Sequence, residues 1–127
     1  MNTQEPVRGR RVVITGMGVV SPVGSTVESF WNSLKTGRHG FGVIDAFDVT
    51  PYKVKLGGQV RDFDPLAFLD RKEARRMDRF VQFAMAAASM AMADSGLDVQ
   101  AVGPFRVGTI IGSGIGCLLY TSPSPRD

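Results

Sequence analysis

Cysteine and histidine are nearly absent from this sequence of 127 residues, which holds one of each, Cys117 and His39. A single cysteine excludes an internal disulfide, so no crosslink argues for secretion and we expect a cytoplasmic protein. A single histidine excludes a metal site built from several histidines, and we expect no metal ion. A nucleophilic role for Cys117 finds little support, because no histidine lies near it in the sequence.

Long apolar runs are also missing. None reaches the roughly 18 residues that a membrane-spanning helix needs. The start of the chain has positive charge before an apolar stretch, as secretory signals do, but Thr15, Gly16 and Gly18 interrupt that stretch and no A-x-A cleavage site follows. We therefore expect a soluble chain that has no membrane partner.

Charge is unevenly distributed. The net charge is +3, and segment 71–79, RKEARRMDR, contains the whole positive excess. On one continuous helix Lys72, Arg75, Arg76 and Arg79 would share a face, with Met77, Phe80, Val81 and Ala84 turned to the core. A solvated charged face is the commoner explanation of such a pattern, and a docking face for an acidic partner is the functional one. Nucleic acid is not expected, since no aromatic residues interleave with the cations for base stacking.

The expected fold class is α/β. Residues 11–15 and 106–111 are rich in β-branched side chains and indicate two buried strands. Residues 37–65 are rich in Gly, Asp and Pro, which predicts a long irregular excursion with one short strand. The order of strand, helix, loop, helix and strand is typical of layered α/β architecture.

Two helices are expected between these strands. The first spans 25–35, with Ser25 as its cap and Glu28 three residues later. The second spans 71–94, with Asp70 and Glu73 as a capping pair, a break near Met77 and Asp78, and a stop at Ser95 and Gly96. Small residues surround the second half of this helix, so we expect it to be buried on most sides.

Glycine clusters follow both expected strands, at 16–18 and 112–116. A dinucleotide-binding fingerprint needs a third glycine at its sixth position, where Ser21 and Cys117 stand instead. Tight turns or close backbone packing therefore explain the glycines better than a nucleotide site does.

Several separated motifs carry a family resemblance. RRVVITGMGVVSPVG, the segment with ESFWNSL, RKEARRMDRFVQFA, DSGL and IGSGIG occur in the order and spacing that resemble the N-terminal end of β-ketoacyl-[acyl-carrier-protein] synthase II. The resemblance covers residues 10 to about 116 and implies the front part of a thiolase-like fold, layered α/β/α/β/α and incomplete in this chain. It also implies a cytoplasmic homodimer of fatty-acid synthesis that needs no cofactor.

The resemblance implies a reaction and a set of site residues. Such acyltransferases load an acyl group onto a cysteine and condense it with malonyl-acyl carrier protein after decarboxylation, with two histidines in support. All three catalytic residues lie downstream in the family, so this chain alone is expected to be inactive. Lys72, Arg75 and Arg76 match positions that contact acyl carrier protein, and Ile115 matches a position in the acyl pocket. The alternative is a noncatalytic module that binds an acidic protein through the basic helix.

The resemblance stops at Cys117, which replaces a further glycine of the turn. Residues 117–127, CLLYTSPSPRD, lack the helix that should follow. We therefore expect residues 1–116 to be the N-terminal portion of a synthase domain and 117–127 to be a non-native tail. A natural divergent end of the protein is the alternative.

Overall fold

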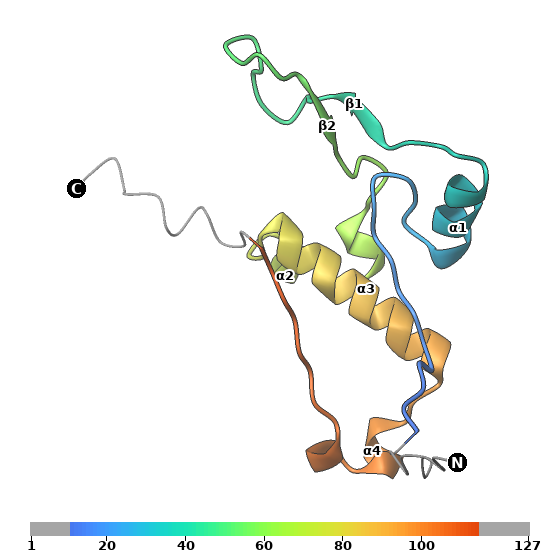
Figure 1. Ribbon diagram of the computed structural model, residues 1–127. Coiled ribbons are helices and arrows are strands. Elements are labelled where there is room, and N and C mark those ends of the chain that lie inside the picture. The colour runs from blue at the N-terminus through green and yellow to red at the C-terminus, as the bar shows by residue number, and fades with distance from the viewer. Residues whose placement is uncertain (1–10, 115–127) are drawn as a thin grey trace, which may run out of the picture.

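The computed structural model describes residues 11–114, and the elements in this range are mainly helical (Figure 1). They are, in chain order, α1 (Val27–Lys35), β1 (Phe41–Val43), β2 (Leu56–Gly58), the 3-10 helix η1 (Pro65–Ala67), α2 (Arg71–Ala74), α3 (Arg79–Ser95), α4 (Val99–Val102) and the 3-10 helix η2 (Pro104–Arg106). Helix α3 is the longest and forms the centre around which the other segments lie.

The N-cap of helix α1 lies one residue later than expected. Thr26 is the N-cap, and its hydroxyl accepts a hydrogen bond of 3.1 Å from the Ser29 amide, while the Thr26 amide donates to the Ser29 hydroxyl at 3.2 Å. The prediction of Ser25 as the cap is therefore wrong. The Ser25 hydroxyl instead donates to the carbonyl oxygen of Asp62. Ser29 determines which residue is the N-cap. Its hydroxyl accepts a hydrogen bond from the backbone amide three residues earlier, which is that of Thr26.

The excursion from residue 37 to 65 contains a hairpin. Strands β1 and β2 pair antiparallel, with Phe41 opposite Gly58 and Val43 opposite Leu56. The sequence predicted one short strand here. Two form because the amides and carbonyls of an extended segment need hydrogen-bonding partners, which a second strand supplies.

The long helical pattern is divided in two, as predicted. Helix α2 ends at Ala74, and α3 starts at Arg79 after Asp78, which has extended backbone angles. At the other end Gly96 adopts the left-handed conformation, with φ of 61°, and ends α3. A residue with a Cβ is strained in that conformation, so the glycine stop is also confirmed.

The two expected strands do not form within residues 11–114. Segments 11–15 and 106–111 pair with no strand, and η2 occupies the start of the second one. Their apolar side chains are largely exposed: 91% for Val12, 84% for Ile14 and 100% for Ile110. A strand needs neighbours on its edges for its backbone hydrogen bonds, and no described segment lies there to pair with either one.

The segment around the first glycine cluster packs against α3. The Met17 amide donates a hydrogen bond of 2.9 Å to Asp94 Oδ2, and the chain then runs along the helix (Figure 1). A Cβ at Gly16 would overlap the carbonyl oxygen of Ala91, and one at Gly18 would overlap that of Ala87. Glycine is required here because two backbones approach closely, as the sequence predicted.

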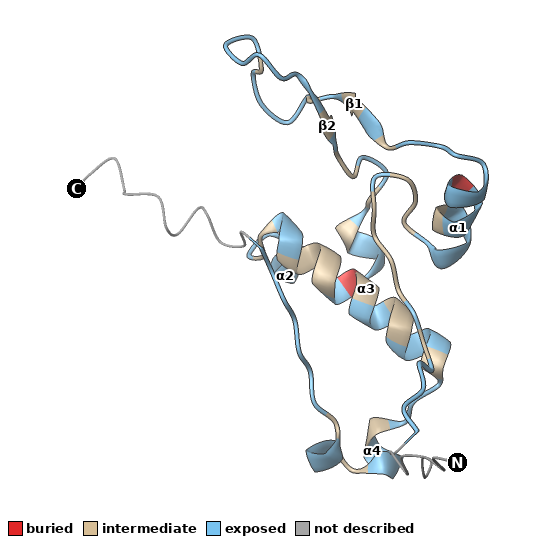
Figure 2. Ribbon diagram, viewed as in Figure 1, coloured by how far each residue is buried: buried red, intermediate tan, exposed pale blue. Residues whose placement is uncertain are grey.

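The core of the described part is small. Buried apolar side chains between residues 11 and 114 belong to Leu69, Ala74 and Ala86, and Figure 2 shows most of the ribbon as intermediate or exposed. The prediction that the second half of α3 is buried on most sides is therefore wrong for this chain, since the neighbours that would cover it are not among the described segments. No helix in this range is long and apolar enough to cross a membrane.

Candidate functional site

Three exposed cations stand together on and just after α2. Lys72 lies in the helix, Arg75 is its C-cap and Arg76 follows directly. We call these residues the basic cluster. Within residues 11–114 none of them forms an ion pair, because the pair found there joins Arg61 to Asp45. The cluster therefore presents three positive charges that no described carboxylate neutralises.

Helix α2 is held at its N-terminus by Asp70. Oδ1 of Asp70 accepts hydrogen bonds from the amides of Lys72 at 2.8 Å and Glu73 at 2.9 Å, which confirms the predicted cap. Ala74 is buried and faces the small core, together with Leu69 just before the cap. A helix of four residues does not stabilise itself, so these contacts determine where the basic cluster lies.

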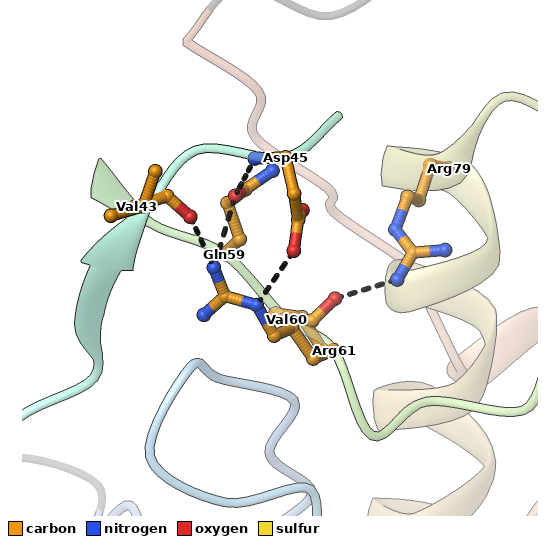
Figure 3. A network of polar contacts seen from close by, with 6 residues as sticks. All are labelled: Val43, Asp45, Gln59, Val60, Arg61 and Arg79. Atoms are coloured by element: carbon orange, nitrogen blue, oxygen red, sulfur yellow. Dashed lines mark hydrogen bonds and ion pairs between the residues drawn. The ribbon is translucent and has the colours of Figure 1, made fainter. Parts of the chain in front are cut away.

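Arg79 does not belong to the basic face, contrary to the sequence prediction. Its guanidinium Nη2 donates a hydrogen bond of 2.7 Å to the carbonyl oxygen of Val60 (Figure 3). The guanidinium carbon also lies 5.9 Å from the ring centre of Phe63 and 5.1 Å from that of Phe83. Because of the break between α2 and α3, Arg79 lies on a different helix from Lys72. The spacing of Arg79 and Phe83, four residues apart on a helix, could have indicated this contact.

A second arginine holds the base of the hairpin. Arg61 Nε lies 3.2 Å from Asp45 Oδ2, and its Nη2 donates to the carbonyl oxygen of Val43 at 2.6 Å and to Gln59 Oε1 at 3.3 Å (Figure 3). Gln59 Oε1 also accepts from the Asp45 amide at 3.0 Å. These contacts fix the segment after β2, from which Val60 offers its carbonyl oxygen to Arg79.

An open hollow of about 770 Å³ lies between α1 and this segment. Its charged and titratable lining residues are Arg38, His39, Arg61 and Asp62. Arg61 is already engaged by Asp45, and His39 is an exposed loop residue, as the sequence indicated. The serine and threonine hydroxyls that line it donate to backbone carbonyl oxygens or to one another, and none donates to His39. The basic cluster is therefore the stronger candidate site.

The remaining predicted sites are not assembled in the described part. Gly16 and Gly18 serve helix packing, which agrees with the interpretation against a nucleotide site. Gly112 and Gly114 have open space where a Cβ would stand. Ile115, Cys117 and the tail 117–127 lie outside the described residues.

Known proteins resemble this chain along most of its length. The family model for the N-terminal domain of beta-ketoacyl synthase matches residues 9–126. The 3-oxoacyl-[acyl-carrier-protein] synthase 2 of Vibrio harveyi is 49% identical over 109 residues, and that of Synechocystis is 45% identical over 109 residues. Each of these matches covers 86% of this chain and 26% of the relative. The corresponding protein of Coxiella burnetii is 50% identical over 107 residues, which is 84% of this chain and 26% of that protein.

A solved structure supports the same conclusion for the fold. The ishigamide ketosynthase/chain length factor superposes with a TM-score of 0.66 at 38% identity, over 72% of this chain and 23% of that chain. The chain thus spans about a quarter of the length of its relatives and has an incomplete part of the thiolase-like fold, as the resemblance implied. Since the family model matches nearly the whole sequence, the chain belongs to the β-ketoacyl synthase family.

Proposed function

We propose that this chain is the N-terminal part of a 3-oxoacyl-[acyl-carrier-protein] synthase and that it supplies a docking surface for acyl carrier protein. The whole enzyme would be an acyltransferase that extends acyl chains by decarboxylative condensation with malonyl-acyl carrier protein. The catalytic cysteine and histidines of the family lie downstream of this segment, so the chain by itself would not condense substrates.

The observation that supports this proposal is the basic cluster. Lys72, Arg75 and Arg76 are exposed and form no ion pair with the described carboxylates. Complementary charge of this kind guides an acidic protein to its docking position and speeds association. The relatives named above act, by their names, on a carrier-protein substrate.

The test is a binding measurement on the full 127-residue chain. The chain is immobilised at low density on a biosensor, and acyl carrier protein is passed over it. We expect Lys72→Glu, Arg75→Glu and Arg76→Glu each to weaken binding about 10-fold, which corresponds to about 1.4 kcal/mol. Lys55→Glu is the matched control, since Lys55 is also exposed but lies just before β2. Equal loss in all four variants would contradict the proposal.

The same binding should depend on salt. The Debye length falls from about 10 Å at 0.1 M to about 3 Å at 1 M, so the attraction between exposed charges is screened. We expect the association rate to fall steeply over this range for the wild-type chain and only weakly for the Arg76→Glu variant. A wild-type association rate that salt does not change would argue against electrostatic docking.

Selectivity separates this proposal from the noncatalytic alternative. A module that binds any acidic protein would hold an unrelated acidic protein of the same net charge as tightly as acyl carrier protein. A carrier-docking surface would prefer acyl carrier protein, because both the shape and the charge of the partner must match those of the surface. Equal affinity for the two partners would favour the alternative.

Other parts of the proposal concern the longer enzyme. We propose that it is a cytoplasmic homodimer and that Ile115 lines its acyl pocket. Exchange of Ile115 for Ala in the longer enzyme should broaden the acyl chains that it accepts, and an unchanged chain-length profile would contradict this role.

The division of the chain at residue 116 also stays a prediction. The family model's match runs on to residue 126, past the proposed boundary. Sequencing of the source DNA across the codons for Gly116 and Cys117 tests it. A frame that continues through another glycine would identify 117–127 as non-native, and a frame identical to the present one would contradict the division.

A further inference from the structure

We infer that Gln82 is a positioning residue for carrier docking: its side-chain amide, on α3, holds the end of α2 and thereby fixes the geometry of the basic cluster. The inference rests on the docking function proposed above. Gln82 stands outside the cluster and carries no charge, so neither the charge pattern nor the motifs of the sequence single it out.

The contact is specific in its geometry. Gln82 Nε2 donates to the carbonyl oxygen of Ala74 at 2.8 Å and to that of Met77 at 3.1 Å. Both acceptors are carbonyl oxygens, so only the nitrogen end of the amide can face them and the orientation of the side chain is fixed. Gln82 is half-buried, which shields these two bonds from competition by water.

The two acceptors lie on either side of Arg75 and Arg76 in the sequence. Ala74 is the last residue of α2, where carbonyl oxygens lack partners within the helix, and Met77 follows Arg76 in the break. One side chain therefore holds the backbone before and after the two arginines. Without it, the carbonyl oxygens of Ala74 and Met77 would lose this partner, and only the backbone bonds of the Arg75 and Arg76 amides would hold the end of this four-residue helix, which would fray more readily.

Helix α3 supplies the rigid support. Gln82 is in its first turn, and this turn is also held by Arg79, which binds the Val60 carbonyl oxygen. The position of the cluster is thus tied to the longest helix of the described part. A docking surface works by complementarity, so a mobile cluster would bind a rigid acidic helix more weakly even with all its charges present.

The test uses Gln82→Met, which keeps the length and loses the donor. In the biosensor measurement on the full chain we expect acyl carrier protein to bind about 5-fold more weakly, the effect of one to two neutral hydrogen bonds. Gln100→Met is the matched control, since Gln100 is exposed on α4 and its side chain makes no hydrogen bond within residues 11–114, and it should change binding less than 2-fold. Gln82→Asn, whose amide stops one methylene short, is the second variant and should behave as Gln82→Met does.

A kinetic measurement separates positioning from a general structural role. Residues 9–114 are placed into the full-length Vibrio harveyi relative, in exchange for the matching segment, and this protein is called the chimera below. In the chimera Gln82→Met should raise KM for malonyl-acyl carrier protein about 5-fold and leave kcat unchanged. KM for a carrier-free malonyl thioester should not move. A fall in kcat with both substrates would mean that Gln82 only stabilises the fold, and the inference would be overturned.

The outcomes also distinguish this inference from the docking proposal itself. If the wild-type chain and chimera show no preference for acyl carrier protein, the docking proposal fails. If the cluster variants weaken binding but Gln82→Met does not, docking stands and the role of Gln82 is refuted. In a chimera that already carries Lys72→Glu and Arg76→Glu, Gln82→Met should have little further effect, because there is no functional cluster left to position.

Discussion

Arg79 on the first turn of α3 binds the carbonyl oxygen of Val60 at 2.7 Å, and this bond joins the helix to the segment that follows the hairpin. The charge pattern predicts that Arg79 shares the basic face, whereas in the structure its guanidinium carbon lies 5.9 Å from the ring centre of Phe63 and 5.1 Å from that of Phe83. Two arginines three residues apart, Arg76 and Arg79, therefore differ in their contacts: the Arg79 side chain bonds to the Val60 carbonyl oxygen, and Arg76 is exposed.

Exchange of Arg79 for Lys should separate these roles. Lysine keeps the charge but lacks the planar guanidinium group. The hydrogen bond to the Val60 carbonyl oxygen and the contacts with the two phenyl rings should therefore weaken. We expect the chimera to lose about 1 kcal/mol of stability, measured by chemical denaturation, with carrier binding changed less than 2-fold. Arg71→Lys is the control, because the Arg71 side chain forms no hydrogen bond or ion pair within the described range. A large loss of carrier binding in the Arg79→Lys variant would indicate that Arg79 contributes to docking.

Exchange of Gly18 for Ala tests the close contact between segment 16–18 and α3. The new Cβ would overlap the Ala87 carbonyl oxygen and lie 2.9 Å from the Met90 Cβ, so one backbone must move. Overpacking of this kind costs about 1–3 kcal/mol. We expect the thermal midpoint of the chimera to fall accordingly. Equal midpoints for the Gly18→Ala variant and the parent chimera would refute the packing role.

Exchange of Asp70 for Ala tests the cap of α2. The amides of Lys72 and Glu73 lose their acceptor, at a cost of about 1 kcal/mol. Hydrogen exchange at these two amides in the chimera should become faster, and carrier binding should weaken because Lys72 loses its fixed position. Asp70→Asn keeps an oxygen acceptor and should stay close to the wild type. Unchanged exchange rates in the alanine variant would show that the cap does not stabilise α2.

The unpaired apolar segments predict the behaviour of the isolated chain. Val12, Ile14 and Ile110 are each more than four-fifths exposed, and they lie in extended segments without strand partners in the described part. Such edges and apolar patches associate with one another. We expect the free 127-residue chain to aggregate at micromolar concentration, as measured by light scattering, and the chimera to stay dispersed. A monodisperse monomer with a sharp cooperative melt would contradict this expectation.

Local chemistry along the sequence determined the helices well. Asp70 as a cap, the break at Met77 and Asp78, and the stop at Gly96 each depend on one residue and its near neighbours, and all three are confirmed. Of the two explanations that the sequence favours for the glycines, tight turns or close backbone packing, the structure shows close packing at Gly16 and Gly18 and open space at Gly112 and Gly114. The predicted N-cap of α1 is wrong by one position, because Ser25 and Thr26 are both residue types that cap helices well. Only the hydrogen bonds between Thr26 and Ser29 distinguish them.

Tertiary structure decided what depends on distant partners. Residues 11–15 have strand-forming side chains, but a strand exists only where another lies beside it, and no strand of the described part pairs with them. The side-chain contacts of Arg79 and Gln82 likewise depend on acceptors outside α3, the carbonyl oxygens of Val60, Ala74 and Met77. The sequence by itself determined the family and the bounds of the main helices, because these depend on local motifs and caps. Only the fold decided which distant carbonyl oxygens the side chains of Arg79 and Gln82 contact.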